Sequence, residues 1–235
     1  MTIKALRISA LSPENEMSET IGLNGIILSS QPIGEYDRRV VILTKERGKI
    51  ACFAKGARRP TSHLAGLTRV FSFGTFFVYE GRSSYSIHGA EIKNYFENVL
   101  KDYDATLYAC YFCEIADYYG REGLESKDAI NLLYAAISSL TRQSPERKLS
   151  KAVYEIRVVS DQGECPPLDK LFASPSDVLS ANTLNAFNYV LTCDTDKLFK
   201  FTVGDDTIKQ MEMISEKIIS YAIDKKLKSK EMLSQ

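Results

Sequence analysis

Residues 55–60, with the sequence KGARRP, place three fixed cations, Lys55, Arg58 and Arg59, within five positions. Gly56 and Pro60 are typical of a turn. The strand-like run at 49–54 should therefore deliver these cations to the rim of a sheet. Guanidinium groups present paired N–H donors that match phosphate oxygens, so the loop predicts phosphate binding. The alternative interpretation is a basic loop that only faces solvent.

More cations surround this loop. Arg38 and Arg39 open the preceding strand-like run, and neighbouring strand residues point to opposite faces, so both can line one groove only if one lies at the rim. His63 falls in the basic loop, where a phosphate or base contact competes with plain solvation. The full predicted phosphate-contact set is Arg38, Arg39, Lys45, Arg47, Lys49, Lys55, Arg58, Arg59, His63 and Arg69.

Charge is unevenly distributed, although 30 basic residues balance 30 acidic ones over the whole chain. Residues 21–90 contain ten lysine or arginine residues against four aspartate or glutamate residues, a local excess of +6. Residues 91–235 contain 18 basic and 23 acidic residues. Basic charge concentrated in one part of a chain indicates contact with nucleic acid, without indicating which sequence is read.

Aromatic residues are interleaved with these cations and could stack on bases. They are Tyr36, Phe53, Phe71, Phe73 and Tyr79. Aromatic residues in a small barrel usually fill its core, so most of these are expected there. One or two exposed rings would be enough to bind a single strand.

The composition predicts an ordinary globular chain of 235 residues, with 44% hydrophobic and 26% charged residues. We find no apolar run long enough to span a membrane and no signal-peptide pattern, so we expect a cytoplasmic, nucleoid-associated protein. Motifs of nucleotide-binding, zinc-protease or serine-hydrolase sites are missing, and two histidines exclude a His-rich metal site. We therefore expect no enzyme, no cofactor and no metal. Cys110 and Cys113 form a CxxC pair inside a predicted helix, where packing is the favoured interpretation.

Periodicity changes near residue 95, which predicts an α+β protein of two domains. Before it, five short runs rich in β-branched and aromatic residues alternate with turn signals, and they predict a closed barrel. An OB-fold is the first choice and an SH3-like barrel the second. Helical spacing follows, with apolar positions such as Cys110 and Tyr221 expected to face a core. The expected strands are 23–30, 38–44, 49–55, 70–80 and 85–95, and the expected helices are 103–119, 126–140, 148–159, 176–191 and 205–226.

Several spaced motifs resemble the bacterial DNA repair and recombination mediator family RecO. They are GEYDR at 34–38, TKERGK at 44–49, KGARRP at 55–60, and FVYEGR at 77–82, with Leu64, Gly66, Leu67 and Phe71 in between. The match is specific over residues 22–95 and looser to about residue 165. It implies an N-terminal OB-fold, here residues 21–95, and a helical C-terminal domain, here residues 96–235. Residues 1–20 are then an extension that we expect to be a flexible arm.

The resemblance also implies binding of single- and double-stranded DNA, annealing of complementary strands, and help in loading recombinase onto strands coated by single-strand-binding protein. Its implied partners are RecR and the C-terminal tail of single-strand-binding protein. Many relatives carry a four-cysteine zinc module, where this chain keeps only Cys165, so we expect that module to be lost. An OB-fold RNA-binding module and a protein scaffold with weakened DNA binding remain as alternatives.

Overall fold

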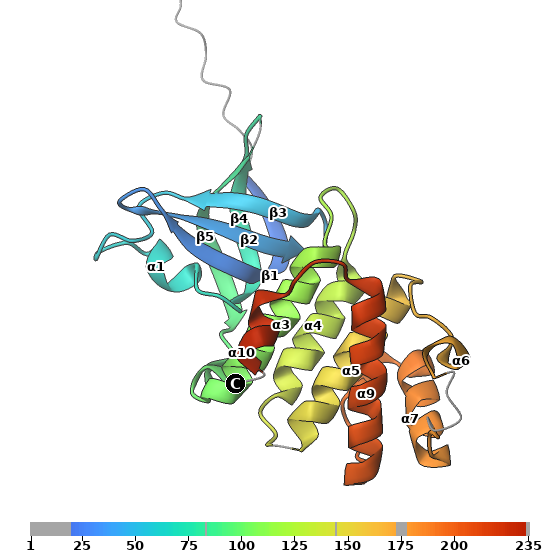
Figure 1. Cartoon of the computed structure of the whole chain (residues 1–235). Helices are drawn as coiled ribbons and strands as arrows, with labels where there is room; N and C mark the ends of the chain where they lie inside the picture. The colour runs from blue at the N-terminus through green and yellow to red at the C-terminus, as the bar shows by residue number, and fades with distance from the viewer. Residues whose placement is uncertain (1–19, 83, 144, 173–177, 234–235) are drawn as a thin grey trace, which may run out of the picture.

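Five strands form a closed barrel at the start of the described chain (Figure 1). The computed structural model describes residues 20–82, 84–143, 145–172 and 178–233. The expected arm at 1–20 lies outside these residues except for Thr20, which begins β1. The strands are β1 (Thr20–Ile33), β2 (Asp37–Thr44), β3 (Gly48–Ala54), β4 (Phe73–Glu80) and β5 (Tyr85–Asn94).

The strand order β1-β2-β3-β5-β4 closes on itself, which confirms the expected five-stranded barrel. The first half of β1 pairs with β4 and the second half with β2, and a bulge between Ile27 and Ser29 bends the strand between them. A short parallel pairing of β3 with β5 completes the barrel. Gly74 lies at a second bulge, where a Cβ atom would come within 2.1 Å of the Glu91 carbonyl oxygen.

Alternating side chains divide the barrel strands between two hydrophobic cores. The inward positions, among them Ile42, Cys52 and Phe76, fill the barrel itself. The outward positions of β1 and β2, such as Ile26, Val41 and Leu43, join the core of the helical region instead. One continuous core therefore crosses the predicted domain boundary at residue 95, and the division into two domains stays a prediction.

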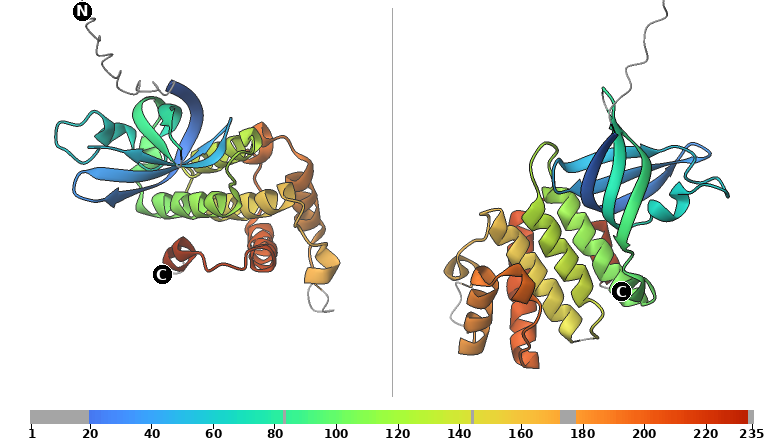
Figure 2. Two further views of the ribbon diagram at one scale, coloured as in Figure 1. Left: turned by 90° about the horizontal axis from the view of Figure 1, so that it is seen from above. Right: turned by 180° about the vertical axis from the view of Figure 1, so that it is seen from behind.

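Helices make up the rest of the described chain, as expected (Figure 2). Helix α3 (Tyr103–Tyr119) packs on α4 (Lys127–Ser139), α4 on α5 (Glu146–Asp161), and α5 on α9 (Asp205–Ala222), while α10 (Lys228–Leu233) returns to pack on α3. The bounds of the expected strands and helices differ from the observed ones by a few residues, and those of α3 agree at both ends. The helices are α1 (Leu64–Leu67), α2 (Glu97–Leu100), α3 (Tyr103–Tyr119), α4 (Lys127–Ser139), α5 (Glu146–Asp161), α6 (Leu168–Leu171), α7 (Ala181–Thr192), α8 (Thr195–Leu198), α9 (Asp205–Ala222) and α10 (Lys228–Leu233). The first two residues of the expected helix 176–191 lie outside the described residues, and the short helices α1, α2, α6, α8 and α10 were not expected.

Two side chains expected in the helical core face solvent instead. Tyr221 is 70% exposed, because Ile218 and Ile219 meet the core in the last turn of α9 and Tyr221 does not. Cys110 is exposed on α3, whereas Cys113, three residues on, is buried. The cysteine pair therefore does not lie on one face, and burial holds the pKa of the Cys113 thiol well above its usual value.

Polar contacts join the helices at two points, one partly buried and one fully buried. Asp102 caps α3 by accepting from the Ala105 N–H at 3.0 Å, and it also pairs with Arg147 of α5 at 2.5 Å. The hydrogen bond from Arg147 is the main reason why the pKa of Asp102 is lowered. Deeper in the bundle, Glu155 accepts hydrogen bonds from Tyr111 of α3 and, at 3.1 Å, from Lys151.

The β2–β3 turn is clamped to the loop between α3 and α4 by backbone hydrogen bonds. The Lys49 N–H donates to the Arg121 carbonyl at 3.0 Å, and the Ser126 N–H donates to the Lys45 carbonyl at 2.9 Å. Gly48 lies at the centre of this clamp with φ +66°, and a Cβ atom there would come within 2.0 Å of the Arg121 oxygen. Only glycine fits this close approach of two backbones.

No helix within the described residues is both long and apolar enough to cross a membrane.

Candidate nucleic-acid interface

The β1–β2 turn and the β3–α1 loop lie side by side at the end of the barrel away from the helices (Figure 1). The Arg58 N–H donates to the Tyr36 carbonyl at 2.8 Å, and the Gly56 N–H donates to the Asp37 carboxylate at 2.7 Å. Gly34 and Gly56 take the positive φ angles, +56° and +68°, that these tight turns need. The two loops thus form one fixed surface.

Arg58 and Arg59 are held on this surface by contacts that leave donors available. Arg58 Nη1 donates to the Gly34 carbonyl at 3.2 Å and to the Glu35 carbonyl at 3.1 Å. Because a guanidinium carries five N–H groups, its Nε and Nη2 keep three for an anion. The Arg59 guanidinium lies over the Tyr36 ring, 5.1 Å from its centroid, which is a cation–π arrangement. Both side chains are exposed and preorganised.

Arg38, Arg39 and Lys55 extend the same surface along the barrel rim. Arg38 is two residues before the inward-facing Val40, so its side chain points to the same face of β2. It lies at the mouth of the barrel, where it donates a hydrogen bond to Ser30 Oγ at 3.1 Å. Its Nε is buried and has no hydrogen-bond partner among the described residues. Arg39 points outward and is exposed, and Lys55 is exposed directly after β3. We call these five cations the basic edge: Arg38, Arg39, Lys55, Arg58 and Arg59.

Three other predicted cations lie at the opposite end of the β2–β3 hairpin. Lys49 Nζ donates to the Asp117 carbonyl at 2.5 Å and lies 3.4 Å from the carboxylate of the same residue. Arg47 pairs with Glu80 at 3.4 Å, and Lys45 belongs to the turn clamped to the helical region. The structure therefore separates these eight predicted cations into two groups, about 20 Å apart along the strands.

His63 and Arg69 flank α1. His63 Nε2 donates to the His88 carbonyl at 3.1 Å, which ties the β3–α1 loop to β5. The Arg69 guanidinium lies 6.0 Å from the centre of the Tyr95 ring, near the start of the helical region. Neither residue belongs to the basic edge.

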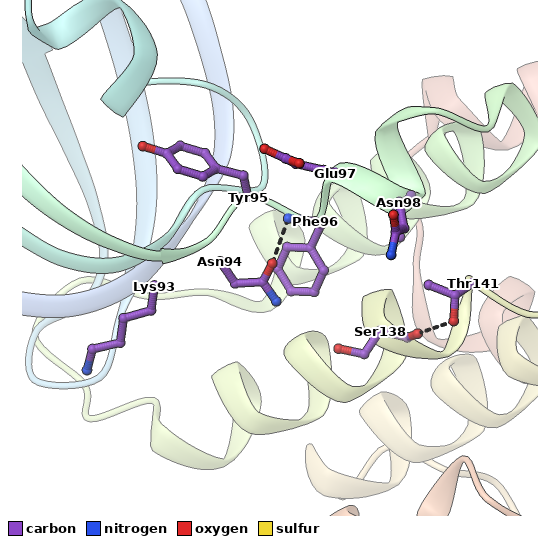
Figure 3. Close-up of a pocket in the computed structure, with 9 residues that line it drawn as sticks. Lys93, Asn94, Tyr95, Phe96, Glu97, Asn98, Ser138 and Thr141 are labelled. Atoms are coloured by element: carbon purple, nitrogen blue, oxygen red, sulfur yellow. Dashed lines mark hydrogen bonds between the residues drawn. The ribbon is translucent and has the colours of Figure 1, made fainter.

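A pocket of about 360 Å³ lies where the barrel meets the helices, between the end of β5, α2 and the end of α4 (Figure 3). One of its polar side chains joins the two regions: Asn94 accepts from the Phe96 N–H at 2.8 Å and donates to the Tyr134 hydroxyl at 3.0 Å. These bonds hold Phe96 at φ +50°. The pocket is therefore a structural joint between the two regions.

A larger cleft of about 890 Å³ lies beside the clamped β2–β3 turn. Leu43 and Leu132 contribute apolar walls, and Leu124 is 61% exposed in the loop at its edge. Arg121, Lys127 and Arg157 add positive charge to its lining, and Glu125, Asp128, Asp161 and Asp194 add negative charge. The cleft thus combines apolar surface with charges of both signs.

Among the described residues, no three His, Cys, Asp or Glu side chains gather so that they could hold a metal ion. Cys165 and Cys193 are half-buried free thiols. The expected loss of the zinc module stays a prediction.

Two family models match this chain one after the other. The model for the Recombination protein O N terminal matches residues 17–96, and the model for the Recombination protein O C terminal matches residues 100–178. The chain belongs to the RecO family. RecO proteins are non-enzymatic recombination mediators in DNA repair, and the resemblance found in the motifs is thereby confirmed.

Individual RecO relatives align over most of their length. The chain is 25% identical to the DNA repair protein RecO of Acetivibrio thermocellus, over 86% of this chain and 91% of that protein. It is 28% identical to the DNA repair protein RecO of Clostridium perfringens, over 89% and 95%. The protein of the same description from Alkaliphilus metalliredigens is 32% identical over 63% of this chain and 60% of its own length.

Proposed function

We propose that this RecO family member binds single- and double-stranded DNA through the backbone phosphates, largely without sequence specificity, and anneals complementary strands. The observation that carries the proposal is the basic edge, where two hydrogen-bonded loops present five cations at one rim of an OB-type barrel. Phosphate contacts carry no base information, which is why we expect little dependence on sequence. The second group of cations and the pair at α1, namely Lys45, Arg47, Lys49, His63 and Arg69, are proposed as weaker contacts.

Annealing follows from charge neutralisation in this proposal. Two complementary strands repel each other through their phosphates, and a cationic rim that contacts both strands lowers this repulsion while bases find their register. Arg58 and Arg59 are the strongest candidates, because their guanidinium groups are already positioned by Gly34, Glu35 and Tyr36. Preorganised side chains lose less conformational freedom when they bind.

The helical region is proposed as the surface for protein partners, in the cytoplasm at the nucleoid. We propose a RecR-like protein and the C-terminal tail of single-strand-binding protein as those partners, which would place recombinase on coated strands. We propose the cleft beside Leu124 for a hydrophobic peptide end, because it has apolar walls and because Arg121, Lys127 and Arg157 are available to meet a terminal carboxylate among the acidic lining residues. The residues that would bind the RecR-like protein are not assigned.

An annealing assay tests the proposal directly. Complementary labelled oligonucleotides are mixed with the full chain, with and without single-strand-binding protein, and the rate of duplex formation is followed. We expect the wild-type chain to accelerate annealing and the Arg58→Ala/Arg59→Ala chain to lose most of this acceleration. A matched control, Lys197→Ala/Lys200→Ala, removes two exposed cations from the helical region and should anneal like the wild type. Equal rates with and without the wild-type chain would refute the proposal.

A further inference from the structure

The face of the barrel formed by β3, β5 and β4 carries aromatic rings on its outside. On β3, Cys52 and Ala54 point into the barrel, so Phe53 between them points outward. On β4, the inward positions include Val78, so Phe77 and Tyr79 point outward. None of these three rings belongs to either hydrophobic cluster, and Tyr79 is 39% exposed.

Strand pairing aligns two of these rings in one row. Arg39 of β2 pairs with Phe53 of β3, Phe53 pairs with Ser86 of β5, and Ser86 pairs with Tyr79 of β4. Paired residues share a face of the sheet, so the row runs straight across four strands. Two interstrand spacings, about 10 Å, separate the two aromatic residues, and only the small Ser86 side chain lies between them.

A second layer of rings supports Tyr79. The His88 ring stacks on Tyr79 with a centroid distance of 4.4 Å and an interplanar angle of 27°, and Phe77 lies 6.3 Å from His88. His63 fixes this stretch of β5 through its hydrogen bond to the His88 carbonyl. His88 Nε2 is buried and has no hydrogen-bond partner among the described residues. The rings are thus held in place without being part of a core.

The helical region leaves this face open. Helices α3 and α4 contact the barrel mainly through β1 and β2, where the outward residues Val41 and Leu43 are buried. On β4 and β5, Tyr134 of α4 contacts Phe73 and Asn94, which lie at the other end of these strands from Tyr79 and Ser86. Arg39, on the same strand, is exposed and stands at the end of the aromatic row. It links the row to the basic edge, so aromatic faces and phosphate-binding cations adjoin on one surface.

We propose that Arg39, Phe53, Ser86 and Tyr79, supported by Phe77 and His88, form a base-stacking platform for single-stranded DNA. This inference rests on the proposed function, since the basic edge would hold the backbone while bases stack on the rings. Every base has a π face, so such a platform strengthens binding without selecting sequence. A duplex keeps its bases stacked inside and engages the cations alone. The platform therefore distinguishes single strands from duplexes.

Binding of matched oligomers separates the platform from the basic edge. The full chain is titrated, by fluorescence anisotropy, with oligothymidine, with an abasic oligomer of the same length, and with a duplex of the same length. We expect the wild type to prefer oligothymidine over the abasic oligomer by about tenfold or more. Phe53→Leu/Tyr79→Leu should reduce this preference to near one and leave duplex affinity unchanged. The control Tyr103→Leu removes a 73% exposed ring from α3 and should change nothing.

A tryptophan substitution gives a second readout that does not depend on loss of affinity. The chain contains no tryptophan, so Tyr79→Trp and Tyr103→Trp each introduce a single fluorophore. Stacked bases should quench the Tyr79→Trp emission with oligothymidine and not with the abasic oligomer, while Tyr103→Trp emission stays unchanged.

Two failures can be told apart. If the wild type binds oligothymidine and the abasic oligomer equally, and Arg58→Ala/Arg59→Ala weakens both, the platform is refuted and the basic edge stands. If no oligomer binds at low salt, both proposals fail. Quenching that is identical for the two tryptophan chains would also overturn the platform.

Discussion

The salt dependence of single-strand binding should report how many cations of the basic edge contact phosphates. With about five contacts, the slope of log affinity against log salt should be about −3.5, at −0.7 per phosphate on a single strand. Raising salt fourfold, from 50 to 200 mM, would then weaken binding about 130-fold. Arg58→Ala/Arg59→Ala removes two contacts, so its slope should be about −2.1 and its loss of affinity over the same range about 18-fold.

The assay is fluorescence anisotropy of a labelled oligothymidine at a series of salt concentrations, with thermal melting as a check on folding. Arg58→Lys/Arg59→Lys keeps both charges and should keep most of the slope, while losing the guanidinium contacts to Gly34, Glu35 and Tyr36. The control Lys197→Ala/Lys200→Ala loses the same net charge from exposed positions in the helical region. An unchanged slope for the alanine pair, or an equal fall for the control, would contradict the assignment of phosphate contacts to these loops.

Three further predictions concern the clamp, the acid stability and the cleft. Gly48→Ala should lower the melting temperature by at least about 2–4 °C, because the positive φ and the close Arg121 oxygen together cost at least about 1 kcal/mol. The control is Gly66→Ala, whose new Cβ atom has nothing within 4 Å. Equal melting temperatures for the two variants would refute this role of Gly48. Because the folded pKa of Asp102 is lowered, its contribution to stability is present above the unfolded value, about 3.9, and is lost as pH falls through the folded value. Urea unfolding at pH 5 and pH 3 should therefore show a smaller loss for Asp102→Asn than for the wild type, and equal losses would count against this linkage. Leu124→Asp should weaken binding of an acidic, hydrophobic-ended peptide in titration calorimetry without changing DNA affinity, and unaltered peptide affinity would remove the cleft from consideration.

Local sequence pattern was sufficient for the elements but not for the site. Runs rich in β-branched and aromatic residues between turn signals predicted the five strands, and helical spacing placed α3 correctly at both ends. Tyr221 was misplaced because, in the last turn of α9, Ile218 and Ile219 meet the core and Tyr221 does not. Cys110 was misplaced because its neighbour three positions on, rather than Cys110 itself, meets the core.

Pairing between distant strands determined what the sequence could not show. The ten predicted cations are close in sequence, but the hairpin carries Arg39 to one end and Lys45 and Lys49 to the other, where α3 supplies Asp117. Likewise, the alignment of Phe53 with Tyr79 depends on the parallel pairing of β3 with β5, which joins residues more than thirty positions apart. Register of this kind leaves no local signal in a single sequence.

The β2–β3 hairpin joins two surfaces that would otherwise be independent. One end carries Arg38 and Arg39, and the other is clamped beside the cleft at Leu124. A nucleic acid at the first end and a peptide at the second would not compete for space, since about 20 Å of rigid sheet separates them. A single copy of the chain would therefore hold a nucleic acid and a peptide at the same time. The length of the hairpin would then fix the distance between the bound peptide and the bound DNA strand.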